Sequence, residues 1–277
     1  MDGLASIWAS PTGRVGLAIV IALSICAILA PLLAPYLPSA INVAIRFSPP
    51  SPSHWLGTDH LGRDLLSRVL YGARIALGVS VAVTGLALMI GALLGVGAAY
   101  SPPLLERAIL VVFDLVSSYP TVILALAFVA VLGPGVTNLI VVVTVVFVPQ
   151  FGRVARAQAL ALRHRSFLEA EVIIGASPTR ILFHHLLPNI IGPLIVLASM
   201  NVPTVITLEA GLSFLGLGVR PPLASWGSML YDGFLNLNQA AWPVVVSAGA
   251  LSLATLGFTL FGEALQAVID PLRHEDS

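Results

Sequence analysis

The chain has 277 residues, of which 57% are hydrophobic and only 9% are charged. Soluble domains carry about 25% charged residues, so this chain has too few to cover a water-facing surface. The net formal charge is +0, and all 13 basic residues are arginines. This pattern argues against nucleic-acid binding and against lysine-based chemistry. The single cysteine, Cys26, excludes a disulfide framework and a thiolate metal site.

Several apolar runs are long enough to cross a membrane, which takes roughly 20 residues of helix. The first run is too long for the apolar part of a signal peptide, so we interpret it as a membrane helix. The fourth run is short, and we expect its helix to continue out of the bilayer through Arg153 and Arg156. The sequence therefore predicts an all-α, polytopic membrane protein with about six spans, over residues 15–37, 75–100, 108–132, 137–151, 190–217 and 241–266.

The arginines are distributed unevenly between the two sides of these spans. Cytoplasmic loops usually carry the excess of basic residues. More arginines fall on the side that holds both termini, which predicts cytoplasmic termini. That side receives Arg14, Arg107, Arg153, Arg156, Arg163, Arg165, Arg180 and Arg273, and the other receives Arg46, Arg63, Arg68, Arg74 and Arg220.

The first outer loop, residues 38–74, ends in a pattern typical of an amphipathic helix. Polar residues recur at three- and four-residue spacing from His60 to Arg74, with leucines and valines between them. We expect a helix that lies at the membrane interface and leads into the second span. Asp64 and Arg68 are spaced to pair on it. In the second span, Gly91 and Gly95 indicate close packing between helices.

A cytoplasmic segment, residues 166–189, predicts two short helices joined by a tight turn. Ser166 and Glu169 form a capping box, so the first helix should begin at Phe167. Gly175 should end it, Ser177 and Pro178 should start the second, and Pro188 should close the unit. The helices are short for independent stability and expose the apolar residues Phe167, Ile173, Ile181 and Phe183. Either the segment binds another protein, or it folds back on the bundle.

Two acidic residues, Glu209 and Asp114, lie in or near apolar spans. An ionisable group at bilayer depth usually faces the bundle interior or a water-filled path. Glu209 could hydrogen-bond helix ends or line such a path, and Asp114 could lie near its cytoplasmic mouth.

His54 and His60 lie in the outer loop without the spacing of metal ligands, so we interpret them as interfacial side chains. Asp232 and residues 236–238 should form an outer loop.

Residues 166–189 resemble the EAA loop of ATP-binding cassette (ABC) importer permeases. The matching residues are Glu169, Ala170, Gly175, Leu187 and Pro188, and the resemblance also implies Ala176 as part of the coupling loop. Two positions depart from the family pattern: Glu171 replaces the second alanine, and His185 replaces an isoleucine that often precedes Leu-Pro, as is usual in the peptide-transporter branch. The resemblance implies that this loop inserts into a groove on a separate ATPase subunit and couples hydrolysis to movement of the permease helices.

The resemblance extends over residues 54–271, specifically to C-type permeases of the dipeptide/oligopeptide/nickel branch. Its matching stretches are residues 54–59, 61–64, 67–68, 71–74, 209–218, 221–222 and 225–227. It implies residues 1–74 as an N-terminal helix with an outer loop, and residues 75–277 as the permease core containing the coupling loop.

The same resemblance implies a set of partners in a bacterial inner membrane. These are a second, B-type permease, one or two ABC ATPase subunits that hold ATP and magnesium, and an extracytoplasmic solute-binding protein. This chain itself is expected to bind no cofactor, metal or nucleic acid. Di- and oligopeptides are the expected cargo, with nickel complexes, haem and glutathione left open.

Two other function classes fit the sequence less well. A self-contained secondary transporter or channel should show intramembrane coupling residues and internal repeats, and no repeats are detectable. An intramembrane hydrolase should place a nucleophile and a base at bilayer depth, yet no histidine falls within a predicted span and there is no GxSxG. A Walker phosphate loop is also missing, so any ATPase must be a separate chain.

Overall fold

The computed structural model of the protein describes residues 8, 10–163, 165, 166, 171, 174–177 and 180–269. Within these ranges the chain forms helices and loops, without a strand. The helices are α2 (Pro11–Ile28), α3 (Ala30–Leu33), η1 (Val43–Ile45), α4 (Leu65–Tyr100), α5 (Pro103–Ser117), α6 (Thr121–Leu132), α7 (Val136–Leu162), η2 (Ile181–Leu186), α10 (Leu187–Phe214), α11 (Trp226–Leu235) and α12 (Trp242–Ile269).

The all-α membrane architecture predicted from composition is confirmed. Five helices are long and apolar enough to cross a membrane, or six if the bent pair α5–α6 counts as one span. The fourth predicted span does continue through Arg153 and Arg156, since α7 ends only at Leu162. The helix α11 has no counterpart among the predicted helices, and its residue Asp232 was expected in a loop.

The third predicted span, residues 108–132, is not the single helix that we expected. It consists of α5 and α6, whose axes meet at 92°. The break lies at residues 118–120, where Pro120 precedes the first residue of α6. Proline lacks the N–H needed to continue a helix and biases the preceding residue away from helical geometry. The apolar run hid this break, because hydropathy does not register backbone geometry.

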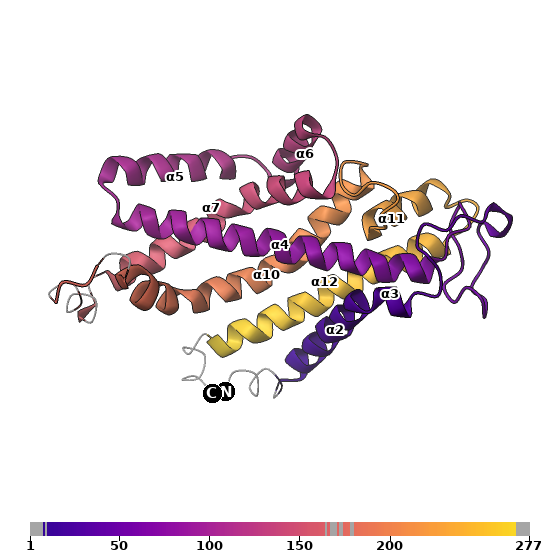
Figure 1. The fold of residues 1–277 in the computed structure, drawn as a ribbon, viewed down its shortest axis with the longest axis horizontal. Helices are drawn as coiled ribbons and strands as arrows, with labels where there is room; N and C mark the ends of the chain where they lie inside the picture. Colours follow the sequence, from indigo (N-terminus) through magenta and orange to yellow (C-terminus); the bar gives the residue numbers. More distant parts are fainter. Residues whose placement is uncertain are drawn as a thin grey trace.

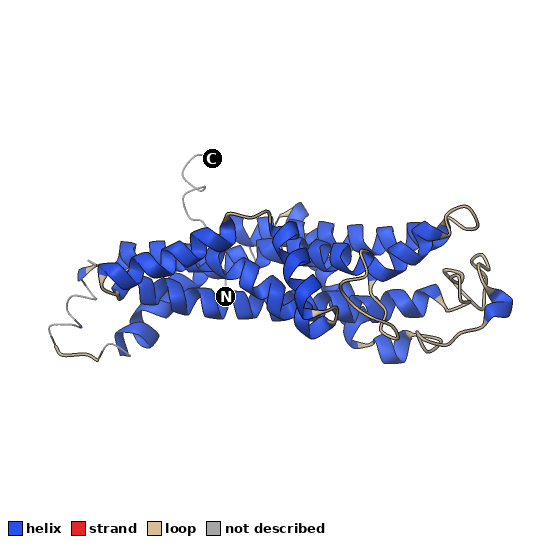
Figure 2. Ribbon diagram, turned by 90° about the horizontal axis from the view of Figure 1, so that it is seen from above, coloured by secondary structure: helices blue, strands red, loops and turns tan. Residues whose placement is uncertain are grey.

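Successive long helices run in alternating directions along one axis (Figure 1). Residues 34–64 and α11 therefore lie at one end of the bundle, and the end of α7 and the start of η2 lie at the other (Figures 1 and 2). The first residues of α2 and the last residues of α12 point toward the second of these ends (Figure 1). This arrangement agrees with the predicted placement of both termini on one side.

The largest hydrophobic cluster forms where α4 packs on α7, and two glycines permit the close approach. A Cβ atom at Gly95 would lie 2.1 Å from the carbonyl oxygen of Gly152, and one at Gly91 would lie 2.6 Å from the Cβ of Phe151. Small residues let helix backbones approach in this way within a membrane, where burial alone does not drive helices together. The predicted role of Gly91 and Gly95 in helix packing is confirmed.

The predicted interfacial helix ahead of the second span is wrong. The helix begins at Leu65 and is continuous with the span, so α4 runs without a break to Tyr100. Asp64 is its N-cap and accepts hydrogen bonds from the Ser67 N–H and hydroxyl, both at 2.8 Å. Asp64 therefore caps the helix and does not pair with Arg68. The polar side chains Arg63 and Arg68 are buried, because they face other parts of the protein instead of water.

Candidate translocation and coupling sites

The segment between α7 and α10 contains the left-handed turn that the sequence predicts. Gly175 has φ +79°, and the Ala176 N–H donates to the Glu171 carbonyl oxygen at 2.9 Å. This is the geometry of a helix C-terminus closed by glycine. Beyond the turn, the Arg180 N–H donates to the Ser177 hydroxyl at 3.3 Å, as expected of an N-cap. The predicted helix start at Phe167, the residues Glu169 and Ala170, and Pro178 lie outside the described residues.

The second predicted short helix is not a separate unit. The π-helical turn η2 continues directly into α10, so Pro188 does not end a helix but lies in the first turn of α10. A proline is tolerated where a helix changes its hydrogen-bond pattern, because the bond that its missing N–H would make is already interrupted. Leu187 adjoins Pro188 at this junction. The turn η2 is therefore helically continuous with the membrane helix α10.

This segment exposes large apolar side chains at the end of the bundle. Ile174 is 73% exposed and Phe183 is 57% exposed, whereas Ile181 packs against the main hydrophobic cluster. Phe167 and Ile173, which we also expected on this surface, lie outside the described residues. An apolar surface of this kind at a loop is typical of a site that binds another protein.

A cavity of about 650 Å³ opens on the side of α10, between the start of α6 and α12. Many of its lining side chains are threonines, and none is charged. The lining residues are Thr121, Val122, Pro203, Thr204, Thr207, Leu208, Gly211, Leu212, Leu215, Thr255 and Thr259. Hydroxyl groups on an otherwise apolar wall suit a solute that carries neutral hydrogen-bonding groups.

A smaller cavity of about 290 Å³ shares Thr121 with the first and extends toward α7, where it is lined by Gln150 and Arg153. Asp114 lies beside it and accepts a hydrogen bond from Arg153 at 2.9 Å. The Asp114 side chain remains 67% exposed. The structure thus brings Asp114 close to a possible path, although its role in a path stays a prediction.

Glu209 lies in the packed interior instead of on the wall of the large cavity. Its side chain is 1% exposed, and its Oε1 accepts a hydrogen bond from the Ser213 hydroxyl at 2.7 Å. The same hydroxyl accepts from the Val219 N–H at 3.0 Å, so these contacts tie α10 to the turn that follows it. They match the structural alternative for Glu209, and its role in the path stays a prediction.

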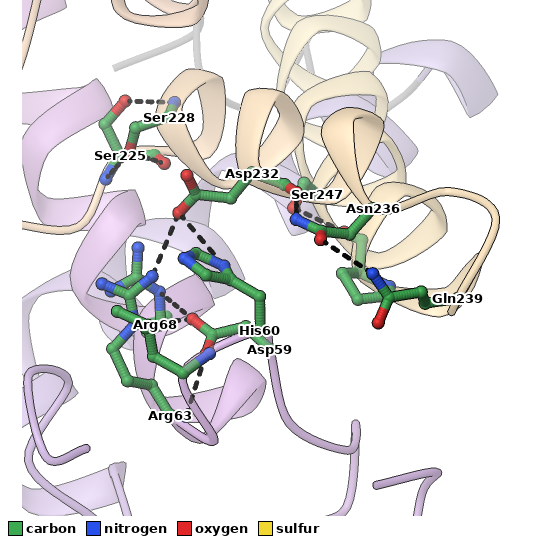
Figure 3. Close-up of polar contacts among 12 residues, drawn as sticks. Asp59, His60, Arg63, Arg68, Ser225, Ser228, Asp232, Asn236, Gln239 and Ser247 are labelled. Atoms are coloured by element: carbon green, nitrogen blue, oxygen red, sulfur yellow. Dashed lines mark hydrogen bonds and ion pairs between the residues drawn. The ribbon is translucent and has the colours of Figure 1, made fainter. Parts of the chain in front are cut away.

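Sequence reasoning missed a cluster of charged residues at the end of the bundle that holds residues 34–64 and α11. We call it the outer charge cluster, after the side predicted for this end: Asp59, His60, Arg63, Arg68 and Asp232 (Figure 3). The Asp59 Oδ2 atom lies 2.6 Å from the Arg63 Nε and 3.5 Å from the Arg68 Nε. Arg63 also donates to Asp232 at 3.0 Å. The cluster therefore joins the outer loop and α4 to α11, which is 169 residues away from Arg63 along the chain.

The outer charge cluster brings three potential metal ligands together. One ligand atom each of Asp59, His60 and Asp232 lies within 4.8 Å of the others. Both carboxylates, however, already pair with arginine: Asp59 with Arg63 and Arg68, and Asp232 with Arg63. A cation would have to compete with these guanidinium groups, so the charges favour a structural role for the cluster.

His54 has a structural environment at the same end. Its Nδ1 lies 2.9 Å from Asp64, and its ring stacks on Tyr36 with centroids 4.7 Å apart. Trp226 further fixes α11, since its indole N–H donates to the Val69 carbonyl oxygen of α4 at 3.1 Å. The Asp-x-x-Ser pattern of Asp64 and Ser67 could have revealed the N-cap of α4. No local signal pointed to the contacts between this region and α11.

Most of the chain matches one known protein family. Residues 66–274 match the family described as binding-protein-dependent transport system inner membrane component. The chain belongs to this family. Residues 7–50 match the N-terminal transmembrane domain of oligopeptide transport permease C. The permease is therefore a component of a transport system of the inner membrane, not a catalytic enzyme, and the family recognised from the sequence is confirmed.

Individual relatives agree with this assignment. The permease is 40% identical over 258 residues to the dipeptide transport system permease protein DppC of Alkalihalophilus pseudofirmus, covering 93% of this chain and 84% of the relative. It is 34% identical to the oligopeptide transport system permease protein OppC of Bacillus subtilis, covering 98% and 88%. The fold is similar to a chain of the inward-facing MetNI methionine ABC transporter, with TM-score 0.57 and 21% identity, covering 73% of this chain and 96% of that one.

Proposed function

We propose that this permease forms, with a second permease of the B type, the path by which di- and oligopeptides cross the bacterial inner membrane. ATP and magnesium are held by one or two separate ABC ATPase subunits, and an extracytoplasmic binding protein delivers the peptide. The relatives named for dipeptide and oligopeptide transport support this cargo. In this proposal the permease binds no cofactor of its own.

The observation that carries the proposal concerns residues 166–189, which we call the coupling segment. This segment is continuous with the helix that forms the wall of the large cavity. The segment that exposes Ile174 and Phe183 continues through η2 into α10. The same α10 contributes Pro203, Thr204 and Thr207 to the cavity. A displacement imposed on the segment by an ATPase would therefore reach the residues that line the cavity. The proposed residues that contact the ATPase are Glu169, Ala170, Gly175 and Ala176, and those that transmit the displacement to α10 are Glu171, Leu187 and Pro188.

The neutral cavity wall also supports peptides over nickel ions. A peptide presents amide groups that can hydrogen-bond with threonine hydroxyls, whereas a bare divalent cation favours carboxylate or imidazole ligands. In this proposal, Asp114 with Arg153 stands at the cytoplasmic side of the path, and Glu209 supports the wall of the path through its contact with Ser213.

We expect Gly175→Val to lower ATP-driven uptake of a radiolabelled dipeptide, such as alanyl-alanine, by at least about tenfold. Valine at φ +79° strains the backbone and shifts the turn that presents the segment to the ATPase. Uptake into proteoliposomes that contain the assembled transporter, with ATPase retention measured by co-purification, checks this result. Gly133→Val is the matched control, because Gly133 has φ +85° and similarly open surroundings but lies in the turn after α6. Equal uptake by the two variants would contradict the coupling role.

The proposed orientation places residues 34–64 outside the cell and residues 166–189 in the cytoplasm. In a Cys26→Ala background, a membrane-impermeant maleimide should label Ser53→Cys in intact spheroplasts. It should label Ser166→Cys only after the membrane is opened. Both serines are exposed, so accessibility is set by the side of the membrane. The reverse labelling pattern would invert the topology.

A further inference from the structure

Two polar side chains face each other across the turn of the coupling segment. The Nε2 atom of His185 lies 3.4 Å from the Oε1 atom of Glu171, and the two side chains are 25% and 19% exposed. The Oε2 atom of Glu171 and the Nε2 atom of His185 are buried and make no hydrogen bond with the described residues. These are also the two positions at which the segment departs from the EAA pattern, so the two departures are in contact with each other.

The pair joins the two sides of the turn at Gly175. Glu171 precedes the left-handed turn at Gly175, and its carbonyl oxygen is bound by the Ala176 N–H at 2.9 Å. His185 lies in η2, which runs directly into α10. We call the described residues before the turn, Glu171 and Ile174, the arm. The contact therefore connects the arm to the helix that lines the large cavity.

We propose that Glu171 and His185 form a strut that fixes the arm before the turn against α10, so that ATPase-driven displacement of the arm reaches the cavity wall. Both are positioning residues, and the proposal rests on the proposed function of the coupling segment. The two polar groups face each other at 3.4 Å in a site that is mostly withdrawn from water, where electrostatic interactions are poorly screened.

A strut of this kind predicts a specific pattern among substitutions. Removing one partner of a mostly buried polar pair leaves the other group without its partner, whereas replacing both with apolar residues is often nearly neutral. Glu171→Ala and His185→Ile should therefore each be damaging, and the double variant should recover. The double variant also places alanine and isoleucine at the two positions, as the EAA pattern most often does. These residues suit an apolar contact between the arm and η2.

The experiment measures alanyl-alanine uptake per ATP hydrolysed by the assembled transporter in proteoliposomes, together with co-purification of the ATPase. We expect each single variant to lower uptake per ATP by about tenfold, a typical size for an allosteric coupling term. The double variant should return to within about threefold of the unmodified protein, with ATPase association unchanged in all three. As a matched control, Glu106→Ala removes a half-buried ion pair with Arg156 outside the segment and should leave uptake per ATP unchanged.

Three results overturn the strut: single variants that transport normally, a double variant whose loss equals the product of the single losses, or loss of the ATPase from either single variant. The last would make these residues part of the docking surface. The Gly175→Val result separates this inference from the proposed function. If Gly175→Val abolishes uptake while the pair shows independent losses, only the strut fails; if Gly175→Val transports normally, the coupling role itself fails, and the strut with it.

Discussion

Asp59→Ala should lower the thermal midpoint of the permease in detergent by roughly 10 °C. This is the largest loss of stability that we expect from a single substitution in the outer charge cluster. Asp59 is the carboxylate between Arg63 and Arg68, and the side-chain exposures of the three are 5%, 9% and 3%. Its Oδ1 atom also accepts the Leu61 and Arg63 N–H groups at 2.9 and 3.0 Å. Alanine would leave two buried guanidinium groups beside an unpaired loop backbone, at a cost of about 3–5 kcal/mol.

The matched control is Asp232→Asn at the other carboxylate of the cluster. Asp232 is 29% exposed and pairs with Arg63 at 3.0 Å, so asparagine can still accept that hydrogen bond. We expect a loss of about 1 kcal/mol for this variant. Heating the purified proteins and measuring the monodisperse fraction by size-exclusion chromatography gives both midpoints. Equal shifts for the two variants would show that Asp59 does not hold the cluster together.

Gly95→Leu should prevent normal accumulation of the permease in the membrane. The Cβ alone would lie 2.1 Å from the Gly152 carbonyl oxygen and 3.0 Å from the Arg156 nitrogen. These are backbone atoms, so the clash cannot be relieved by a rotamer change, and α4 must separate from α7. Overpacking typically costs about 1–3 kcal/mol and more when the backbone must move. This site lies against the main hydrophobic cluster, so the damage should extend through the core.

Gly97→Leu is the matched control for this variant, since it makes the same chemical change two residues away. A Cβ at Gly97 meets no atom within 4 Å. We expect normal membrane levels for Gly97→Leu, and less than about a tenth of the normal level for Gly95→Leu by quantitative immunoblotting of membranes. Comparable levels of the two proteins would refute the close α4–α7 contact.

The outer loop shows why a correct local pattern led to a wrong structure. The spacing of polar residues from His60 to Arg74 is that of a helix with one polar face, and part of it is helical in α4. The pattern could not show what the polar face contacts. Arg63 pairs with Asp232 of α11, which lies 169 residues later in the chain, so this part of the face that we expected at the interface is buried. The partner of a charged side chain depends on packing, not on spacing.

In the coupling segment, too, one feature could be predicted from local sequence and others could not. The turn at Gly175 was predictable, because a left-handed residue is a local property of the backbone and glycine is the residue that tolerates it. The continuity of η2 with α10 was not predictable from Pro188, which normally marks the end of a helix. The contact between Glu171 and His185 also required the folded turn, since the two residues are too far apart in sequence to meet within one helix.

By itself, the sequence determined that this protein is a helical membrane protein and which family its motifs resemble. Both conclusions rest on local quantities: the length of apolar runs that a bilayer requires, and residue types at fixed spacing. Only the tertiary structure decided where the third span bends, which charges pair at the outer end, and which face of α10 borders the cavity. Those features depend on contacts between helices far apart in the chain, and no local pattern specifies them.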